Sequence, residues 1–213
     1  MPISEPAAGQ SAAPVAASAA GDRSLEILDA AVEAFASQGY AQTDVQVIAD
    51  RVGIGKGTVY RRFGNKETLF LATVKHARDK LIAAVDAVQD PERDPLLQLR
   101  TCMTAILQFF DSHQEIVHLL IEERALFRDR RPSLFFEHDE ERRCEWADRL
   151  RAMVAAGKIR DLPVPQIQDA LSRFVFGAMF FNYFEGNRKP LVEQSEAMFD
   201  MLFNGLLAKP SLS

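Results

Sequence analysis

Cysteine is scarce in this chain of 213 residues, which has two, Cys102 and Cys144. Two isolated thiols are too few for a disulfide scaffold and lack the spacing of a zinc site, so we expect no metal and a reducing, cytoplasmic setting. Both are expected to be buried structural residues, with a redox-sensing pair as the alternative. No apolar run reaches the ~18 residues of a membrane span, so no membrane partner is expected.

Positive charge is also in deficit, which at first argues against a nucleic-acid partner. The chain has 25 Lys and Arg against 30 Asp and Glu, a net charge of −5. The deficit is uneven, because residues 22–80 hold nine basic and eight acidic side chains and the rest of the chain carries the negative excess. The acidic remainder would be kept away from phosphates, while the first part can still meet them.

Residues 1–21 have neither Lys nor Arg, and Glu5 is their one charged side chain. They are rich in Ala, Ser and Pro and lack the basic segment and long apolar segment of a signal peptide. We expect a disordered tail over residues 1–21. Its lack of basic residues argues against strong contact with DNA.

Strand patterns are missing as well, because no segment after residue 88 alternates apolar and polar residues. Apolar residues recur at helical spacing instead, with Gly and Pro between the segments. The predicted fold class is all-α, with a first helical domain over residues 22–74 and a second over residues 75–213. The longer helices are expected at residues 23–38, 66–88, 96–111, 115–127, 134–156, 166–185 and 191–207.

The sequence VQVIADRVGIGKGTVYRRF, residues 45–63, predicts two short helices joined by a tight turn. Gly53 stands in the turn, where a positive φ favours glycine. Ile48 faces inward from the first helix, and Val59 and Phe63, four apart, face inward from the second. This is the pattern of a helix-turn-helix, whose second helix can enter the DNA major groove.

Polar residues flank these helices at positions that favour helix starts. Thr43 with Gln46 predicts a capping box for the first short helix. Gly55 is an acceptable N-cap for the second short helix, and Asn65 can cap the long helix that follows.

The inward stripe turns the polar side chains of the second short helix outward. Residues 51–66 include five basic residues and no acidic one, a local field that a phosphate backbone would favour. The predicted DNA contacts are Lys56, Gly57, Thr58, Tyr60, Arg61, Arg62 and Lys66, with Thr43 as a weaker phosphate contact. Lys56 and Thr58 lie in the first turn, where base edges are reached. The alternative is a hydrophobic helical hairpin with a solvated basic face.

A longer pattern surrounds the motif, because K-G-T-x-Y-x-x-F is followed by N-K-E-x-L and preceded by Gly39-Tyr40 in the expected order. Residues 23–74 thus resemble the N-terminal domain of tetracycline-repressor (TetR) family regulators. Two positions depart from the family pattern: Gly55 replaces a frequent serine cap, and Asp44, repulsive to phosphate, replaces a small hydroxyl residue. The resemblance implies a dimeric, ligand-responsive DNA-binding regulator, usually a repressor.

Phenylalanine is concentrated in the second domain, with twelve of the fifteen after residue 100. Aromatic residues at helical spacing are most often core, and a minority can line an apolar cavity. The resemblance implies a small-molecule ligand in this domain, and the His and Glu candidates are the polar groups that would orient it. The candidate ligand-binding residues are Phe109, Phe110, His113, His118, Glu122, Phe127, Trp146, Phe176 and Phe180.

The last two expected helices are apolar on more than one face. A helix that is apolar nearly all round must bury its second face somewhere, and a four-helix contact between two copies of the chain would do so. It also matches the dimer that the resemblance implies. The candidate interface residues are Phe174, Ala178, Phe181, Met198, Phe199, Leu202, Phe203 and Leu206.

Catalytic motifs are missing: there is no H-E-x-x-H, no cysteine cluster and no nucleophile elbow. His118 and Glu122 lie four apart and could share a metal, but a surface pair is the simpler interpretation. We predict a non-enzymatic dimeric transcriptional regulator without a cofactor, a repressor that a mostly apolar small molecule releases from a pseudo-palindromic operator. The alternative is an α-helical small-molecule-binding protein or enzyme with a non-functional helix-turn-helix.

Overall fold

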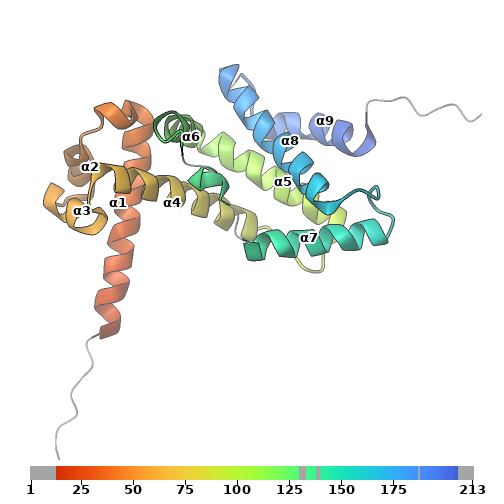
Figure 1. The fold of residues 1–213 in the computed structure, drawn as a ribbon, viewed down its shortest axis with the longest axis horizontal. Helices are drawn as coiled ribbons and strands as arrows, with labels where there is room; N and C mark the ends of the chain where they lie inside the picture. The colour runs from red at the N-terminus through yellow and green to blue at the C-terminus, as the bar shows by residue number, and fades with distance from the viewer. Residues whose placement is uncertain (1–12, 130–132, 138–139, 187, 206–213) are drawn as a thin grey trace, which may run out of the picture. The chain divides into compact units, whose positions relative to one another are not determined.

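The computed structural model of the chain describes residues 13–129, 133–137, 140–186 and 188–205 (Figure 1). These residues form α-helices and one short 3-10 helix, and none of them lies in a β-strand, so the predicted all-α class is confirmed. None of the described helices has both the length and the apolar character of a membrane span. The elements are α1 Ala13–Gln42, α2 Val45–Val52, α3 Lys56–Phe63, α4 Lys66–Asp86, α5 Pro95–Ser112, α6 Gln114–Leu126, η1 Leu134–Phe136, α7 Glu140–Ala155, α8 Val164–Phe184 and α9 Leu191–Asn204.

The chain divides into two compact units, Met1–Thr73 and Val74–Ser213. The first unit is built around a small apolar core to which each of its helices contributes. Phe35, Ile48, Val59 and Phe70 are fully buried. The rings of Phe35 and Phe70 meet edge to face with their centroids 5.1 Å apart. Each helix therefore buries one apolar stripe and leaves its other face to solvent.

The first helix begins earlier than expected. α1 starts at Ala13, so residues 13–21, predicted to belong to a disordered tail, are helical; residues 1–12 lie outside the described residues. Alanine has the highest helix propensity, and Pro14 falls in the first turn, where its missing N–H is tolerated. At Gly39 the φ of 77° interrupts the helix, near the predicted end.

Asp44, rather than Thr43, caps α2. The Asp44 carboxylate accepts a hydrogen bond from the Gln46 N–H at 2.8 Å. Thr43 is buried, and its hydroxyl lies 2.7 Å from the Gly39 carbonyl and 3.2 Å from the Ala34 carbonyl. The predicted capping box is wrong, because this hydroxyl bonds to the end of α1 instead.

The other predicted helix boundaries of this unit agree with the structure. Gly53 ends α2 in the left-handed conformation, with a φ of 68°. Gly55 is the N-cap of α3, and the Asn65 side chain accepts the Thr68 N–H at 2.8 Å at the start of α4.

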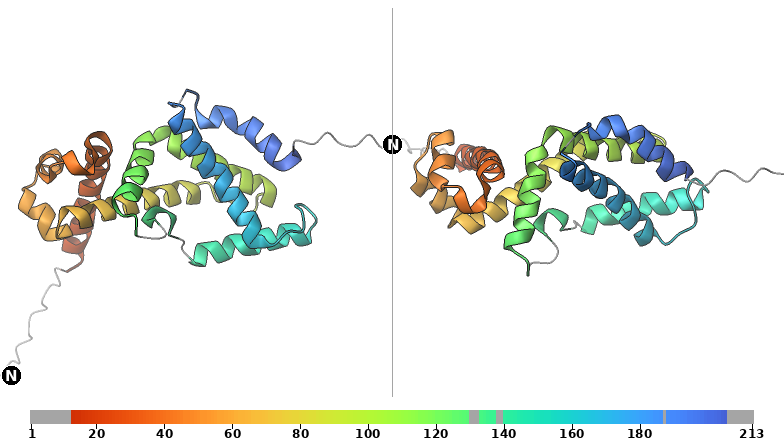
Figure 2. Two further views of the ribbon diagram at one scale, coloured as in Figure 1. Left: turned by 45° about the horizontal axis from the view of Figure 1, so that its top comes forward. Right: turned by 90° about the horizontal axis from the view of Figure 1, so that it is seen from above.

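The second unit is organised around α5, which packs against α6, α7, α8 and α9. Figure 2 shows α8 and α9, drawn in blue, beside α5 in both views. Met103, Leu107 and Phe110 of α5 are buried at this centre. The apolar residues that the sequence distributes over several helices are therefore largely buried within the unit.

The predicted helix over residues 134–156 is wrong, because the structure has η1 and α7 there as separate elements. The buried Glu123 carboxylate of α6 accepts hydrogen bonds from the Ser133 hydroxyl and, at 2.9 Å, from the Leu134 N–H. Arg78 of α4 donates to the Leu134 carbonyl at 3.2 Å. These long-range bonds fix η1 to α6 and α4, and a local apolar pattern does not encode them.

A carboxylate from α5 caps α9. Pro190 precedes α9 and offers no capping side chain. The two carboxylate oxygens of Asp111 instead accept the N–H groups of Leu191 at 2.8 Å and Val192 at 3.0 Å. This contact joins two helices that are distant in sequence and satisfies N–H groups that a helix start leaves unpaired.

Asp111→Ala removes both acceptors from the first turn of α9. We expect the free energy of unfolding to fall by about 1–3 kcal/mol, the cost of unsatisfied N–H groups, with a smaller loss for Asp111→Asn. Urea unfolding followed by circular dichroism measures it. The control Asp148→Ala removes an exposed carboxylate of α7 and should stay within ~0.5 kcal/mol of the wild type. Equal losses in the two alanine variants would contradict the capping role.

Candidate nucleic-acid interface and ligand cavity

α3 buries Val59 completely and leaves its polar side chains at the surface. This orientation is the one that the helical period predicts, since the polar positions follow one another around the remaining circumference. Gly57 is exposed, and the space where a side chain would project is open. The partly or fully exposed polar side chains of α3 are Lys56, Thr58, Tyr60, Arg61 and Arg62, and Phe63 is half-buried.

The two adjacent arginines of α3 have different surroundings. Arg62 donates a hydrogen bond to the Ser24 hydroxyl at 2.9 Å and so ties α3 to α1. Arg61 is exposed, and its guanidinium has no hydrogen bond or ion pair with any residue that the structure describes. Arg61 is therefore the better placed of the two to contact a phosphate.

Lys66, at the start of α4, is held near α1. Its ammonium donates to the Ala41 carbonyl at 3.2 Å and lies 4.8 Å from the centre of the Tyr40 ring, a cation–π contact. The Tyr40 ring packs edge-on against Phe70, and burial, followed by the charge of Glu67, raises the pKa of its hydroxyl. Tyr40 thus fixes the position of a basic group next to α3.

Lys56 is paired with Asp44, the residue that caps α2. The Lys56 ammonium lies 2.6 Å from the Asp44 carboxylate. The Gln46 N–H, followed by the Lys56 ammonium, holds the pKa of the Asp44 carboxyl below its ordinary value, and the bond to Asp44 raises the pKa of Lys56. Both groups are therefore charged at neutral pH, and the surface is less uniformly basic than the run of residues 51–66 suggests.

Thr43 is not part of this surface. Its side chain is buried and its hydroxyl bonds to backbone carbonyls, so the expectation of a weak phosphate contact is corrected. Sequence spacing alone could not distinguish an exposed N-cap hydroxyl from a buried hydroxyl that bonds to backbone carbonyls, because both stand just before a helix.

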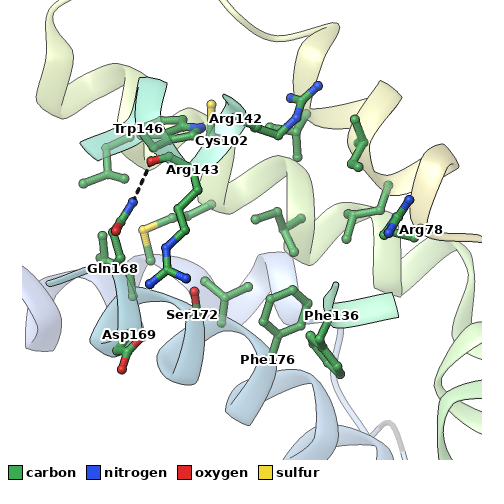
Figure 3. Close-up of a pocket in the computed structure, with 18 of the residues that line it drawn as sticks. Arg78, Cys102, Phe136, Arg142, Arg143, Trp146, Gln168, Asp169, Ser172 and Phe176 are labelled. Carbon is green, nitrogen blue, oxygen red and sulfur yellow. Dashed lines mark hydrogen bonds between the residues drawn. The ribbon is translucent and has the colours of Figure 1, made fainter. Parts of the chain in front are cut away.

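The second unit contains a cavity of about 310 Å³ (Figure 3). Residues of α4, α5, η1, α7 and α8 line it. Its wall is mainly apolar and includes Met103, Phe136, Trp146 and Phe176. An apolar concavity with a few polar groups is typical of a small-molecule site.

Three arginines line the cavity, and they differ in what they bind. Arg142 forms an ion pair with Asp86 through both carboxylate oxygens, which lowers the pKa of that carboxyl. Arg78 donates to the backbone of η1. The Arg143 side chain extends from α7 toward Ser172 of α8 (Figure 3), and within the described ranges its guanidinium has no hydrogen bond or ion pair. Among the residues that the structure describes, Arg143 is therefore the cavity arginine whose guanidinium is available to a ligand.

Of the nine predicted ligand-binding residues, Trp146 and Phe176 line this cavity. The other seven do not line it: Phe109, Phe110, His113, His118, Glu122, Phe127 and Phe180. Phe110 is buried behind Phe176, with ring centroids 6.1 Å apart, and His113 stacks on Phe109 at 4.5 Å. The aromatic bias of the sequence identified the core, and the cavity wall includes residues that no motif singled out.

The two cysteines have different environments. Cys102 is buried, lines the cavity and accepts a hydrogen bond from Gln98, and burial raises the pKa of its thiol. Cys144 is exposed, so the expectation that both thiols are buried is wrong for Cys144. Its helix, α7, has a wide solvent-facing side, which the period alone did not reveal.

An apolar face is exposed on α8 and α9. Phe181 and Phe184 are 66% and 74% exposed, and Met201 is 47% exposed. The expectation that Phe199 lies at the dimer interface is corrected, because its side chain is 1% exposed and belongs to the core. The Arg100 guanidinium lies 5.5 Å from the centre of the Phe199 ring. The other interface candidates, Phe174, Ala178, Met198, Leu202 and Phe203, are partly exposed, and Leu206 lies outside the described residues.

Comparison with known proteins agrees with this architecture. Residues 27–73 match the family described as "Bacterial regulatory proteins, tetR family". The chain is 30% identical over 165 residues to the HTH-type transcriptional repressor KstR2 of Mycolicibacterium smegmatis, covering 76% of this chain and 78% of that protein. It is 30% identical over 101 residues to the HTH-type transcriptional activator FasR of the same species, covering 47% of this chain and 46% of that protein.

The fold is also similar to that of the transcriptional regulator FadR from Bacillus subtilis, solved in complex with stearoyl-CoA. The TM-score is 0.72 and the identity 20%, and the match covers 86% of this chain and 99% of that one. At this identity the likeness is one of fold.

A helix-turn-helix with a basic outer face, followed by a helical second unit, defines a DNA-binding transcriptional regulator. The similarity to KstR2 over three quarters of the chain specifies the family. The chain belongs to the TetR family of transcriptional regulators, which are not enzymes.

Tyr60→Ala tests whether the exposed face of α3 contacts DNA. Tyr60 is partly exposed, so we expect the fold to persist while operator affinity falls roughly tenfold or more, in line with about 1–3 kcal/mol for one good contact. A gel-shift titration with a duplex selected from a random library measures the affinity, and thermal melting checks the fold. Tyr60→Phe, which keeps the ring, separates the contribution of the hydroxyl. Unchanged affinity in Tyr60→Ala would remove this face from the interface.

Proposed function

We propose that this DNA-binding regulator is a homodimeric repressor that leaves a pseudo-palindromic operator when a mostly apolar small molecule enters the cavity of the second unit. The observation that carries the proposal is the presence, in one chain, of an outward-facing basic helix and an apolar cavity of about 310 Å³. The similarity to a protein described as a repressor, KstR2, supports the sign of regulation.

The proposed contacts with DNA come from α3 and the start of α4. They are Lys56, Gly57, Thr58, Tyr60, Arg61 and Lys66. Lys56 and Thr58 reach base edges from the first turn of α3, and Arg61 contacts a phosphate with its guanidinium, which has no partner in the described part of the chain. Because Arg62 already bonds to Ser24, we assign it the role of orienting α3 against α1.

The proposed homodimer forms through the exposed apolar face of α8 and α9. Phe181 and Phe184 are large aromatic side chains that remain in water in the single chain, and their burial against a second copy is favourable. A two-fold axis makes the same face contact itself. The pseudo-palindromic operator follows, with half-sites about 34 Å apart or a multiple of that distance.

Phe181→Glu places a charge in this apolar face. We expect monomers that keep their helical content, because the side chain is exposed in the single chain, and a loss of tight operator binding. Light scattering at micromolar concentration measures the mass. Leu97→Glu is the matched control, since Leu97 is 54% exposed on α5 and should leave the dimer intact. A wild-type monomer under these conditions would contradict the proposal.

The proposed ligand has an apolar body and one anionic group. The volume is near the lower end of the range for small-molecule sites, about 300–1,000 Å³, so it suits a compact molecule. The aromatic wall would bury the apolar body, and the guanidinium of Arg143, which has no partner among the described residues, would meet the anion. That FadR was solved with stearoyl-CoA, a molecule with an apolar chain and anionic groups, supports this class of ligand.

Arg78 is proposed to couple the cavity to α4. It lines the cavity and bonds to the carbonyl of Leu134, next to the aromatic wall residues Phe135 and Phe136. A ligand that displaces these rings would move the Leu134 carbonyl to which Arg78 is bonded. Arg78 lies on α4, the helix that begins at Lys66, so the displacement would be passed to that helix. The ligand acts only if it prefers the state that does not bind DNA.

Ser172→Trp tests the ligand site. Ser172 lines the cavity yet is exposed, so a large side chain there would obstruct the cavity without disturbing the core. We expect the variant to bind operator normally and to resist release by compounds found active on the wild type in a release screen. Gln166→Trp, on an exposed position of α8 outside the lining, should stay responsive.

The screen compares carboxylate-bearing apolar compounds with their neutral amides. Calorimetry then compares ligand affinity for free and operator-bound protein, which must differ by the factor that the ligand imposes on DNA binding. Equal affinity for the two forms would mean that the cavity does not regulate DNA binding. Equal release by amides and acids would remove the role of Arg143.

A further inference from the structure

The pair of Asp44 and Lys56 stands on the surface that is proposed to meet DNA, and the proposed function does not use Asp44. Asp44 Oδ1 accepts the Lys56 ammonium at 2.6 Å and the Gln46 N–H at 2.8 Å. The side chains of Lys56 and Asp44 are 37% and 59% exposed, so both can reach a ligand. Asp44 Oδ2 accepts no hydrogen bond from any residue in the described part of the chain.

The fold needs an acceptor at this position but not a negative charge. Asn caps a helix as well as Asp does, because the cap uses one side-chain oxygen. The carboxylate nevertheless occupies the position, next to the first lysine of α3. A negative charge there opposes binding to a phosphate backbone.

Phosphates and base edges differ in what they offer such a pair. A phosphate presents acceptors alone, so it attracts Lys56 and repels Asp44. A base pair in the major groove presents donors and acceptors together: guanine accepts from a lysine, and the N4 amino group of cytosine donates to a carboxylate. A base edge can therefore satisfy both members of the pair, and a phosphate cannot.

We propose that Asp44 is a specificity-determining residue. It weakens the contact of Lys56 with the phosphates of random DNA and permits the contact of Lys56 with base edges of the operator. The inference rests on the proposed placement of α3 at the DNA. Asp44 acts through its charge on Lys56 and by accepting from a base amino group with Oδ2, while its Oδ1 continues to cap α2.

Asp44→Asn removes the charge and keeps the cap. The probes are the tightest duplex recovered by selection from a random library and a scrambled duplex of the same composition, each titrated with the full-length protein over a series of KCl concentrations. We expect tighter binding to the scrambled duplex and a roughly tenfold smaller ratio of the two affinities, the discrimination of one good base contact. The salt dependence on scrambled DNA should steepen by about one unit per protomer as Lys56 gains a phosphate.

Two further variants make the result decisive. Glu26→Gln removes an exposed carboxylate of α1 and should leave the affinity ratio unchanged. In a Lys56→Met background, Asp44→Asn should steepen the salt dependence less than it does in the wild type, since the release of Lys56 is then lost and only the direct repulsion between Asp44 and phosphate is removed. A rise of both affinities by the same factor in Asp44→Asn would overturn the proposal.

The failure of the proposed interface would look different. If Lys56→Met alone changes neither affinity, the placement of α3 at the DNA is wrong, and the role of Asp44 falls with it. If Lys56→Met weakens binding but Asp44→Asn leaves the ratio and the salt dependence unchanged, the interface stands and only the role of Asp44 is refuted.

Discussion

The surface proposed to contact DNA is carried by α3, a helix of eight residues that the elements around it must hold in place. In α3, Val59 is the fully buried side chain, and burying one valine stabilises by about 1.5–3 kcal/mol. Short helices take most of their stability from tertiary packing. The glycine turn after α2, the bond between Arg62 and Ser24, and the Asp44–Lys56 pair add to this support.

In the second unit, charged side chains that bond to backbone groups likewise hold short elements in position. Asp111 fixes the start of α9, and Glu123 fixes η1 from α6 while Arg78 fixes it from α4. The cavity lies among elements that these bonds position. Arg78 is a residue of α4 that both lines the cavity and anchors η1. A change in the shape of the cavity would therefore act directly on a side chain of α4.

The recognition helix was predictable from the sequence because its signal is local. The spacing of Val59 and the turn at Gly53 both act within a few residues, and the structure has the elements where they were expected. Thr43 and the ligand candidates were not predictable in this way. Whether a threonine caps a helix or bonds to its neighbour depends on where α1 ends, and whether an aromatic side chain lines a cavity depends on five elements meeting.

Local patterns in the sequence were enough to predict the helical class, the helix-turn-helix and the family resemblance, because hydrophobic period, glycine turns and ordered motifs are properties of neighbouring residues. Tertiary packing determines which charged side chains are bonded to other residues and which apolar side chains remain exposed to solvent. Arg61 and Arg62 are adjacent and chemically identical, yet one is unpaired within the described chain and the other is bonded to α1. Phe181 and Phe199 are equally apolar, yet one is exposed and one is buried, because burial depends on what packs against a helix rather than on the helix itself.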